Sequence, residues 1–214
     1  MAPLDVPAAI LKRRSIKRFR PDPISREILQ ELLELTVAAP SSWNLQDWRI
    51  VVVEEESQRG ALCEACFGQG LVAEAPVVFV FAADPTAWQR DLEPILEKAK
   101  ASGAWPPKVV EYLQQAVPDF QQNLGDRNRE YAIKDAMIAA THLVLAAESL
   151  GLASCFLNGW EEGAVKRVIG AADPDLSIAV IVPVGHAAES RSNPGRLDLD
   201  HNVFRDRLSN PYRP

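Results

Sequence analysis

The spacing of hydrophobic residues divides the first half of the chain into helices and short apolar strands. Ser25 suits the N-cap of a helix, and Pro40 marks the end of the periodic pattern that follows it. Two runs rich in β-branched residues have turn-like flanks, which is typical of buried strands. The expected elements in chain order are helices at 4–14 and 25–38, a strand at 48–53, a helix at 57–66 and a strand at 76–82.

The second half begins with an irregular stretch and ends in a regular one. Prolines interrupt residues 85–130, so we expect two or three short helices in a mobile excursion. Residues 130–150 are mostly apolar with a narrow polar stripe, which predicts a long, largely buried central helix. The stripe consists of Lys134, Asp135, Thr141, His142, Glu148 and Ser149. A strand at 153–159, a helix at 161–169, a strand at 177–186 and an extended tail from 187 complete the prediction.

This order predicts an α+β fold with a three-layer core, in one domain spanning residues 1–214. Strands and helices do not alternate strictly, and no Gly-x-Gly-x-x-Gly lies between a strand and a helix. A Rossmann dinucleotide-binding unit therefore has no support.

Composition and charge narrow the class of protein. The 214 residues are 47% hydrophobic and 24% charged, as in soluble globular proteins, and the net charge of −6 gives no overall attraction to nucleic acid or anionic membranes. The chain shows no signal peptide and no membrane span, and its three cysteines suit a reducing compartment. We expect a cytoplasmic protein with neither nucleic-acid nor membrane partners.

Cys63 and Cys66 have the spacing of half a zinc or redox site. No second cysteine pair and no histidine cluster accompanies them. The alternative is two small residues on one helix face, because positions three apart lie on the same side.

A basic run follows the first predicted helix. Residues 13–20 read RRSIKRFR, and a run of this kind is commonly a solvated face. Its composition also suits an anion, because guanidinium groups pair bidentately with phosphate oxygens while a serine and a lysine add further donors.

A second polar segment leads into the first strand. Residues 39–48 read APSSWNLQDW, which combines hydroxyls, carboxamides and two indoles. The segment fits a turn with packed tryptophans. Alternatively, the carboxamides read the edge of a heterocycle, since they offer both donor and acceptor.

These two segments, about 25 residues apart, resemble the flavin-binding hallmarks of the nitroreductase family, the FMN-dependent NAD(P)H oxidoreductases. The resemblance continues in Gly151-Leu152, in Asn158-Gly159, in residues 182–185 (VPVG) and in Arg196. It implies a nitroreductase-like three-layer sandwich, with a central antiparallel or mixed sheet and a long central helix. It also implies an intertwined homodimer with FMN at the subunit interface.

The resemblance assigns cofactor roles to individual residues, and it implies no catalytic side chain because the flavin carries the chemistry. Its cofactor-binding set is Arg13, Arg14 and Ser15 at the phosphate and ribityl chain, Lys17 at the pyrimidine end of the ring, Arg196 at the phosphate, Asn158 and Gly159 at flavin N5, and Ser41, Ser42 and Asn44 from the partner subunit. The sequence departs from the family at Asp47, where proline is common, and a carboxylate there could disfavour anionic substrates.

The activity implied is hydride transfer from NAD(P)H through bound FMN to a small electron-poor acceptor such as a nitroaromatic or a quinone, by a ping-pong mechanism. A flavin sensor or storage protein without turnover remains an alternative, as do reductive dehalogenation and flavin destruction on the same fold. Four aromatic residues of the excursion either pack or cover the flavin face: Trp88, Trp105, Tyr112 and Phe120.

Overall fold

The fold is built on a four-stranded antiparallel sheet. A computed structural model describes residues 3–213 of the chain. The strand order is β1-β2-β4-β3, and all three pairings are antiparallel. The strands are β1 (Trp48–Val53), β2 (Val77–Ala83), β3 (Ala153–Ser154) and β4 (Ser177–Gly185).

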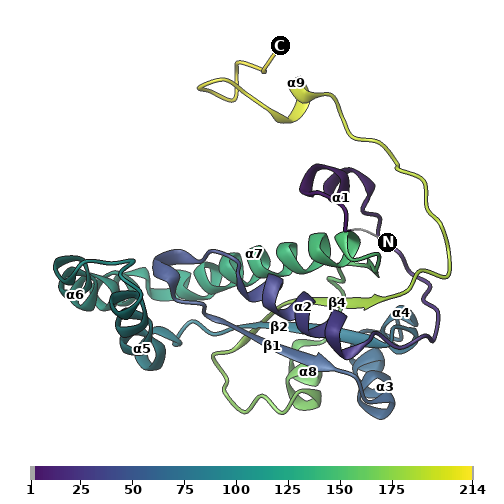
Figure 1. Ribbon diagram of the computed structural model, residues 1–214, viewed down its shortest axis with the longest axis horizontal. Helices are drawn as coiled ribbons and strands as arrows, with labels where there is room; N and C mark the ends of the chain where they lie inside the picture. Colours follow the sequence, from purple (N-terminus) through teal and green to yellow (C-terminus); the bar gives the residue numbers. More distant parts are fainter. Residues whose placement is uncertain (1–2, 214) are drawn as a thin grey trace.

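Helices cover both faces of the sheet (Figure 1). On one face lie α2 (Arg26–Val37) and the long α7 (Asn128–Ser149), and on the other lie α3 (Glu56–Ala65), α4 (Leu71–Glu74) and α8 (Glu162–Val168). The expected α+β three-layer arrangement with a central sheet and a long helix is confirmed.

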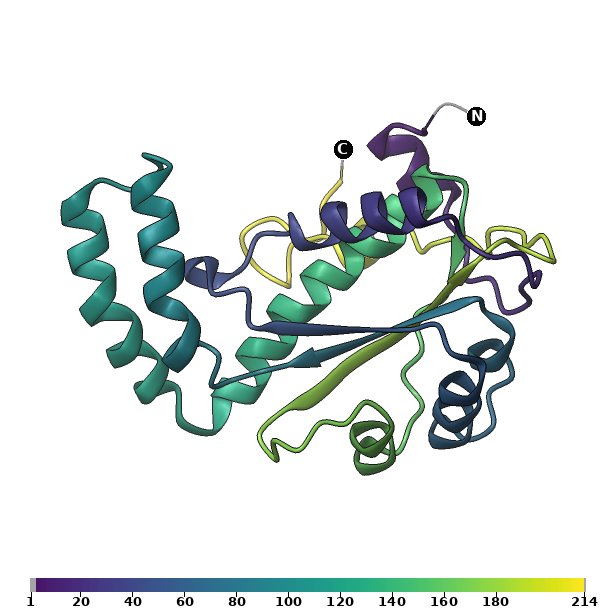
Figure 2. The same ribbon diagram turned by 60° about the horizontal axis from the view of Figure 1, so that its bottom comes forward.

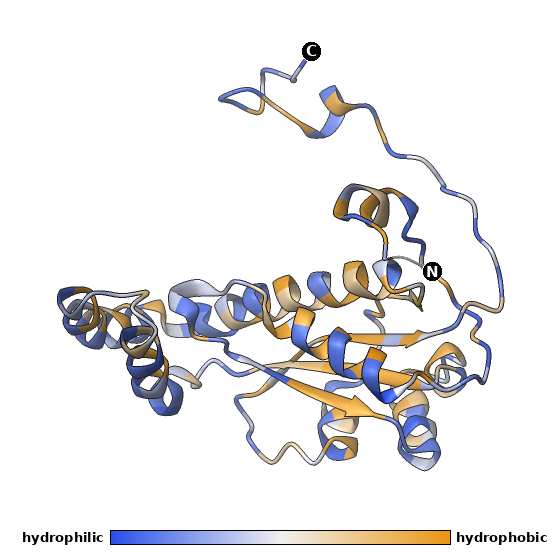
Figure 3. Cartoon of the chain, viewed as in Figure 1, coloured by the Kyte–Doolittle hydropathy of each residue, from blue (hydrophilic) through white to orange (hydrophobic). Residues whose placement is uncertain are grey.

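Successive side chains of β2 point alternately into two different cores, which explains the three layers. Phe79 and Phe81 belong to the core formed with α2 and α7, whereas Val78 and Val80 belong to the core formed with α3 and α8. All four side chains are fully buried. Side chains of a strand point alternately to its two faces, so an uninterrupted apolar run fits a strand that is covered on both sides. Figure 3 shows the strands as the most hydrophobic part of the ribbon.

Most of the expected elements are confirmed with ends within two residues of the prediction, including α1 (Val6–Lys12). The strand expected at 153–159 is shorter. Only β3 pairs continuously, and the chain then leaves the sheet, with an isolated bridge between Leu157 and Ile181.

The excursion at 85–130 differs from the prediction of short, proline-broken helices. It forms two long helices, α5 (Trp88–Ala101) and α6 (Pro107–Leu124), which stand beside each other at one end of the sheet (Figure 2). Pro94 and Pro118 lie inside these helices. Each proline removes one backbone hydrogen bond, and burial of a shared apolar face compensates for the loss. That face consists of Leu92, Leu96, Val110, Leu113 and Val117, packed with Leu45.

The C-terminal tail leaves the body of the molecule after β4. Residues 187–213 are almost all exposed and include the short α9 (Leu199–Asn202). Figure 1 shows this segment running away from the sheet. No helix within residues 3–213 is both long and apolar enough to cross a membrane.

Candidate functional site

The basic run lies along the edge of the sheet. After α1 the chain is extended, and Ile16 and Phe19 are buried and anchor it. The Ile16 amide donates to the Ser154 carbonyl at 3.1 Å, and Phe19 forms an isolated bridge with Ala187. The polar residues between these anchors are held beside β3 and the end of β4.

Five of the predicted cofactor residues line one cavity of about 270 Å³, which we call the basic cavity. They are Arg13, Arg14, Ser15, Lys17 and Arg196. The cavity wall also contains Arg191, Ser192, Asn193 and Pro194, which sequence reasoning did not single out. The structure thus brings two segments together that are about 180 residues apart in the chain, as expected for a phosphate site.

The basic cavity carries unbalanced positive charge. Within residues 3–213, none of Arg13, Arg14, Lys17 and Arg196 pairs with a carboxylate. Arg191 pairs with Glu189, its Nε 2.7 Å from Oε1. This hydrogen bond is the main reason that the pKa of Glu189 lies below its ordinary value. Uncompensated guanidinium groups around a cavity favour a bound anion.

The remainder of the basic run is an ordinary solvated surface. Arg18 pairs with Glu74 at 3.0 Å, and Arg20 pairs with Asp22 at 3.2 Å. Neither arginine lines the basic cavity. The solvated-face interpretation therefore fits Arg18 and Arg20, while the anion-site interpretation stays a prediction for the residues that line the basic cavity.

Asn158 and Gly159 follow β3 and do not line the basic cavity. Asn158 is exposed, whereas the Gly159 carbonyl accepts a hydrogen bond of 2.9 Å from Nε2 of Gln69. A Cβ atom at Gly159 would lie 3.0 Å from that same nitrogen. Gln69 therefore fixes this peptide, and it is a residue that sequence reasoning missed.

The predicted partner-facing residues lie in a strained turn before β1, which we call the serine turn (residues 41–46). Trp43, Asn44 and Gln46 have left-handed φ angles of 55°, 58° and 49°. Non-glycine residues rarely adopt this conformation, and it persists only where the surroundings hold it. The Ser41 hydroxyl accepts from the Gln46 amide at 2.9 Å.

Ser42 is fixed from outside the turn. Its amide donates to Oδ2 of Asp135 at 2.9 Å, and its hydroxyl lies 3.2 Å from Oδ1. Asp135 is on α7 and is 3% exposed. Asp135 belongs to the polar stripe expected for this helix, and its carboxylate is buried against a turn 93 residues away in the chain.

A larger cavity of about 730 Å³ opens between the serine turn and α5. Its lining includes Asn44, Gln46, Arg49, Lys98 and Trp105. Trp105 lines this cavity and also packs against the core of α5 and α6, so its position fits either alternative. Phe120 instead packs edge-on against Trp43, with ring centroids 5.8 Å apart, and so fits the packing alternative.

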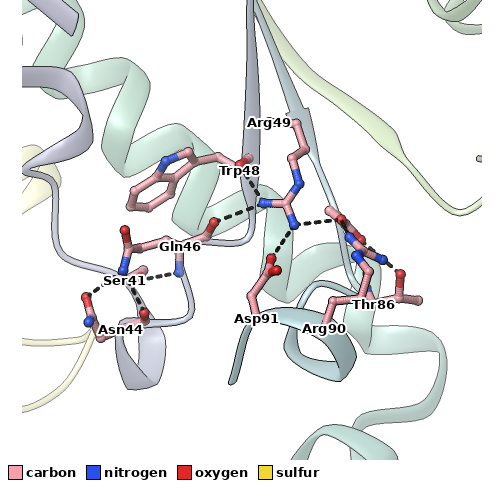
Figure 4. Close-up of polar contacts among 9 residues, drawn as sticks. Ser41, Asn44, Gln46, Trp48, Arg49, Thr86, Arg90 and Asp91 are labelled. Atoms are coloured by element: carbon pink, nitrogen blue, oxygen red, sulfur yellow. Dashed lines mark hydrogen bonds and ion pairs between the residues drawn. The ribbon is translucent and has the colours of Figure 1, made fainter. Parts of the chain in front are cut away.

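Arg49 joins the wall of the large cavity to the sheet and to α5 (Figure 4). Its Nη2 lies 2.5 Å from Asp91 and 3.1 Å from Asp84, and its Nη1 donates to the Trp48 carbonyl at 3.0 Å. Asp84 also binds Arg90 and Thr86. This network was not expected from an apolar strand pattern, and it sets the position of α5 beside the serine turn.

Asp47, at the end of the serine turn, is buried. It is 4% exposed and lines neither cavity, so its carboxyl group does not face a substrate there. Burial and the neighbouring Asp135 raise its pKa to about 7. The expectation that Asp47 disfavours anionic substrates does not follow from this position.

The two groups of predicted residues lie at opposite ends of the sheet. Trp48, which follows the serine turn, pairs with Ala83, and Ala83 with Ser177. At the other end Val184 pairs with Ser154, which bridges to Ser15. Six to seven residues of strand at about 3.3 Å each separate the ends by roughly 20 Å. One chain does not bring the serine turn to its own basic cavity.

The surroundings of Cys63 and Cys66 indicate a structural role for both residues. Cys66 is fully buried and its pKa is raised to about 12 by that burial. The Cys63 thiol donates to the Gln69 carbonyl at 3.3 Å. A thiol with a raised pKa is a poor metal ligand or nucleophile, so the helix-face alternative fits these residues better.

Comparison with known proteins gives the family to which this fold belongs. The family described as "Nitroreductase family" matches residues 10–186. The chain belongs to this family, as the sequence resemblance implied, and is an oxidoreductase.

Individual relatives align with most or nearly all of the chain. A protein of Thermus thermophilus named NADH dehydrogenase is 36% identical over 202 residues, which cover 94% of this chain and 96% of the relative. MhqN of Bacillus subtilis, named as an NAD(P)H nitroreductase, is 30% identical over 183 residues, covering 84% and 88%. A structure from Exiguobacterium sibiricum, assigned as a nitroreductase in complex with FMN, has a TM-score of 0.89 at 23% identity and covers 96% of this chain and 99% of that one.

Proposed function

We propose that this protein is an FMN-dependent oxidoreductase that takes hydride from NAD(P)H and reduces small electron-poor acceptors, such as nitroaromatics or quinones. The observation that carries the proposal is the basic cavity, in which four unpaired cations converge from two distant segments of an acidic protein. The names of the relatives support the nicotinamide donor, and the FMN complex of the structural neighbour supports the cofactor.

The basic cavity fits the phosphate end of FMN. Arg13, Arg14 and Arg196 would hold the phosphate, and the Ser15 hydroxyl adds a donor. Lys17 would lie at the pyrimidine end of the ring, where a positive charge stabilises the reduced, anionic flavin. Bound FMN supplies the acceptor for hydride and the donor of two electrons.

We further propose a homodimer in which the serine turn of one chain faces the basic cavity of the other. The separation of roughly 20 Å between these two groups on one chain supports it, since a single flavin contacted by both needs two chains. Exposed apolar side chains on α1 and in the tail, Val6, Ile10, Leu11, Leu197 and Leu199, offer surface for such an interface. Unpaired thiols suit the reducing cytoplasm.

Ping-pong turnover means that donor and acceptor use the same site in succession. The large cavity beside the serine turn, with Trp105 and Arg49 in its wall, is the proposed place for both. In this proposal the flavin carries the hydride, and the residues of the chain would act by holding the ring and excluding competing orientations.

The visible spectrum of the purified protein, recorded without oxygen before and after adding NADH or NADPH, tests the proposal. A flavin spectrum that bleaches on addition supports the oxidoreductase, and stopped-flow mixing with a nitroaromatic then measures reoxidation. A bound flavin that neither nucleotide reduces would favour the sensor or storage alternative. Loss of halide from an added halophenol, or breakdown of the flavin itself, would identify the other chemistries.

A further inference from the structure

Two carboxyl groups meet in the interior beneath the serine turn, and we call them the acid pair. Asp47 precedes β1 and Asp135 lies on α7; both are at most 4% exposed. Burial raises the pKa of both carboxyl groups, and the neighbouring Asp135 raises that of Asp47 further, to about 7. Two neighbouring buried carboxyl groups resist ionising together, which favours one proton on the pair.

The surroundings place that proton on Asp47. Asp135 accepts two hydrogen bonds from Ser42, which favour its ionised form. Oδ1 of Asp47 is buried and has no hydrogen-bond partner among residues 3–213. An ionised Asp47 would therefore keep Oδ1 buried without a donor, whereas a protonated Asp47 can donate to Asp135.

Among residues 3–213, no arginine or lysine forms an ion pair with either carboxyl group of the acid pair. A third packed element contributes Asp84, directly after β2, whose amide donates to the Asp47 carbonyl at 2.7 Å. Asp84 raises the pKa of Asp47 further. The arginines of this region, Arg49 and Arg90, pair with Asp84 instead of Asp47.

We propose that Asp47 is a positioning residue for the serine turn: its proton binds it to Asp135, and Asp135 in turn holds Ser42 and the left-handed turn in the conformation that receives the cofactor. Loss of the proton puts a second negative charge beside Asp135 and loosens the hold on Ser42. The last step, from turn to cofactor, rests on the proposed FMN function, whereas the protonated pair does not.

The proton is tested first without flavin. Urea unfolding is measured from pH 4.5 to 8.5 for the wild type, for Asp47→Asn, whose amide can donate as the protonated acid does, and for the exposed control Asp175→Asn. A raised pKa means that the folded state keeps a proton the unfolded state has lost between about pH 4 and 7, so wild-type stability falls over that window. Each pH unit in the window changes the folding equilibrium by up to about tenfold.

The expected result is a ratio of folding constants, Asp47→Asn over wild type, that rises by at least about tenfold between pH 4.5 and 8.5. The same ratio for Asp175→Asn should stay flat. Infrared spectra at pH 6 should show a protonated carboxyl band in the wild type that is missing in Asp47→Asn. A flat ratio together with an unchanged band would overturn the proposal.

The positioning step is tested by FMN titration at pH 6 and pH 8.5. Wild-type affinity should fall by roughly tenfold more than that of Asp47→Asn, and comparing the two removes the titration of the FMN phosphate itself. Asp135→Asn should bind weakly at both pH values, because one of the two oxygens that accept from Ser42 becomes an NH2 group that can only donate. Equal pH dependence in wild type and Asp47→Asn would refute the link to the turn, whereas no FMN binding by any protein would refute the proposed function and leave the stability result standing.

Discussion

At the residue scale, the cations of the basic run divide by their partners. Arg13 lines the basic cavity and has no carboxylate partner among the described residues, while Arg20 pairs with Asp22 at the surface. Composition alone predicted an anion site somewhere in the run, and only the fold separates the cations that line the cavity from those that pair with surface carboxylates. Arg191 was missed because the tail has no periodic pattern that would place it.

Arg13→Ala should weaken FMN binding by about tenfold to a hundredfold, because a hydrogen bond to a charged group contributes about 1.5–3 kcal/mol. Equilibrium dialysis or flavin fluorescence measures the affinity, with Arg20→Ala as the matched control. Full FMN occupancy in Arg13→Ala at wild-type affinity would mean that the basic cavity does not hold the phosphate.

Gln69→Ala should destabilise the apoprotein by about 1–3 kcal/mol, since it leaves the half-buried Gly159 carbonyl without its donor. Gln30→Ala is the control, because Gln30 makes its hydrogen bond with Glu34 on the exposed face of α2. Urea unfolding gives both values. Equal effects in the two variants would show that Gln69 does not fix the peptide.

At the element scale, the pattern of hydrophobic residues predicted strands β1, β2 and β4 well and the length of the edge strand β3 poorly. The apolar runs at 48–53 and 76–82 became strands because burial on both faces rewards uninterrupted β-branched residues. β3 stopped after two residues although its sequence continues to be apolar. The pairing partner decides where a strand ends, and no local pattern contains that information.

In the excursion the local pattern predicted more interruptions than the structure contains. A proline in a helix interior costs about 3 kcal/mol, which led us to expect breaks at Pro94 and Pro118. The shared apolar face of α5 and α6 outweighs that cost. The stabilisation that two helices gain by packing together can be estimated only once the fold shows that they are in contact.

Leu96→Ala should cost about 2–5 kcal/mol of stability in the α5–α6 pair, because Leu96 is 1% exposed in its small core. Hydrogen exchange followed by mass spectrometry should show faster exchange in residues 88–124 and little change in β2. Val109→Ala, on the exposed side of α6, is the control. Faster exchange across the whole sheet would mean that the pair does not have a separate core.

At the scale of the whole molecule, the sheet separates the two groups of residues to which the sequence resemblance assigned cofactor roles. The antiparallel register shows why a single chain does not bring these two groups together. The proposed homodimer would bring them together, and mixed variants test it.

Co-expressing Arg13→Ala with Asn44→Gly tests the shared site, because glycine removes the Asn44 side chain without strain at its φ of 58°. Each homodimer should bind FMN poorly. Random pairing makes about half of the dimers mixed, each with one intact site, so about a quarter of all sites should fill. FMN titration of the mixture measures this fraction, and a mixture that binds no better than either variant would place both halves of a site in one chain.

The exposed tail makes the chain open to proteolysis beside the basic cavity. Residues 187–213 lie outside the three layers, yet their first part supplies Arg191 and Arg196 to the basic cavity. A protease that cuts after Pro194 would leave the three layers intact while removing Arg196 from the basic cavity, together with the exposed apolar residues Leu197 and Leu199. Limited digestion should therefore be slower when FMN is bound and two subunits are associated. The rate of cleavage in the tail then measures the fraction of protein without cofactor.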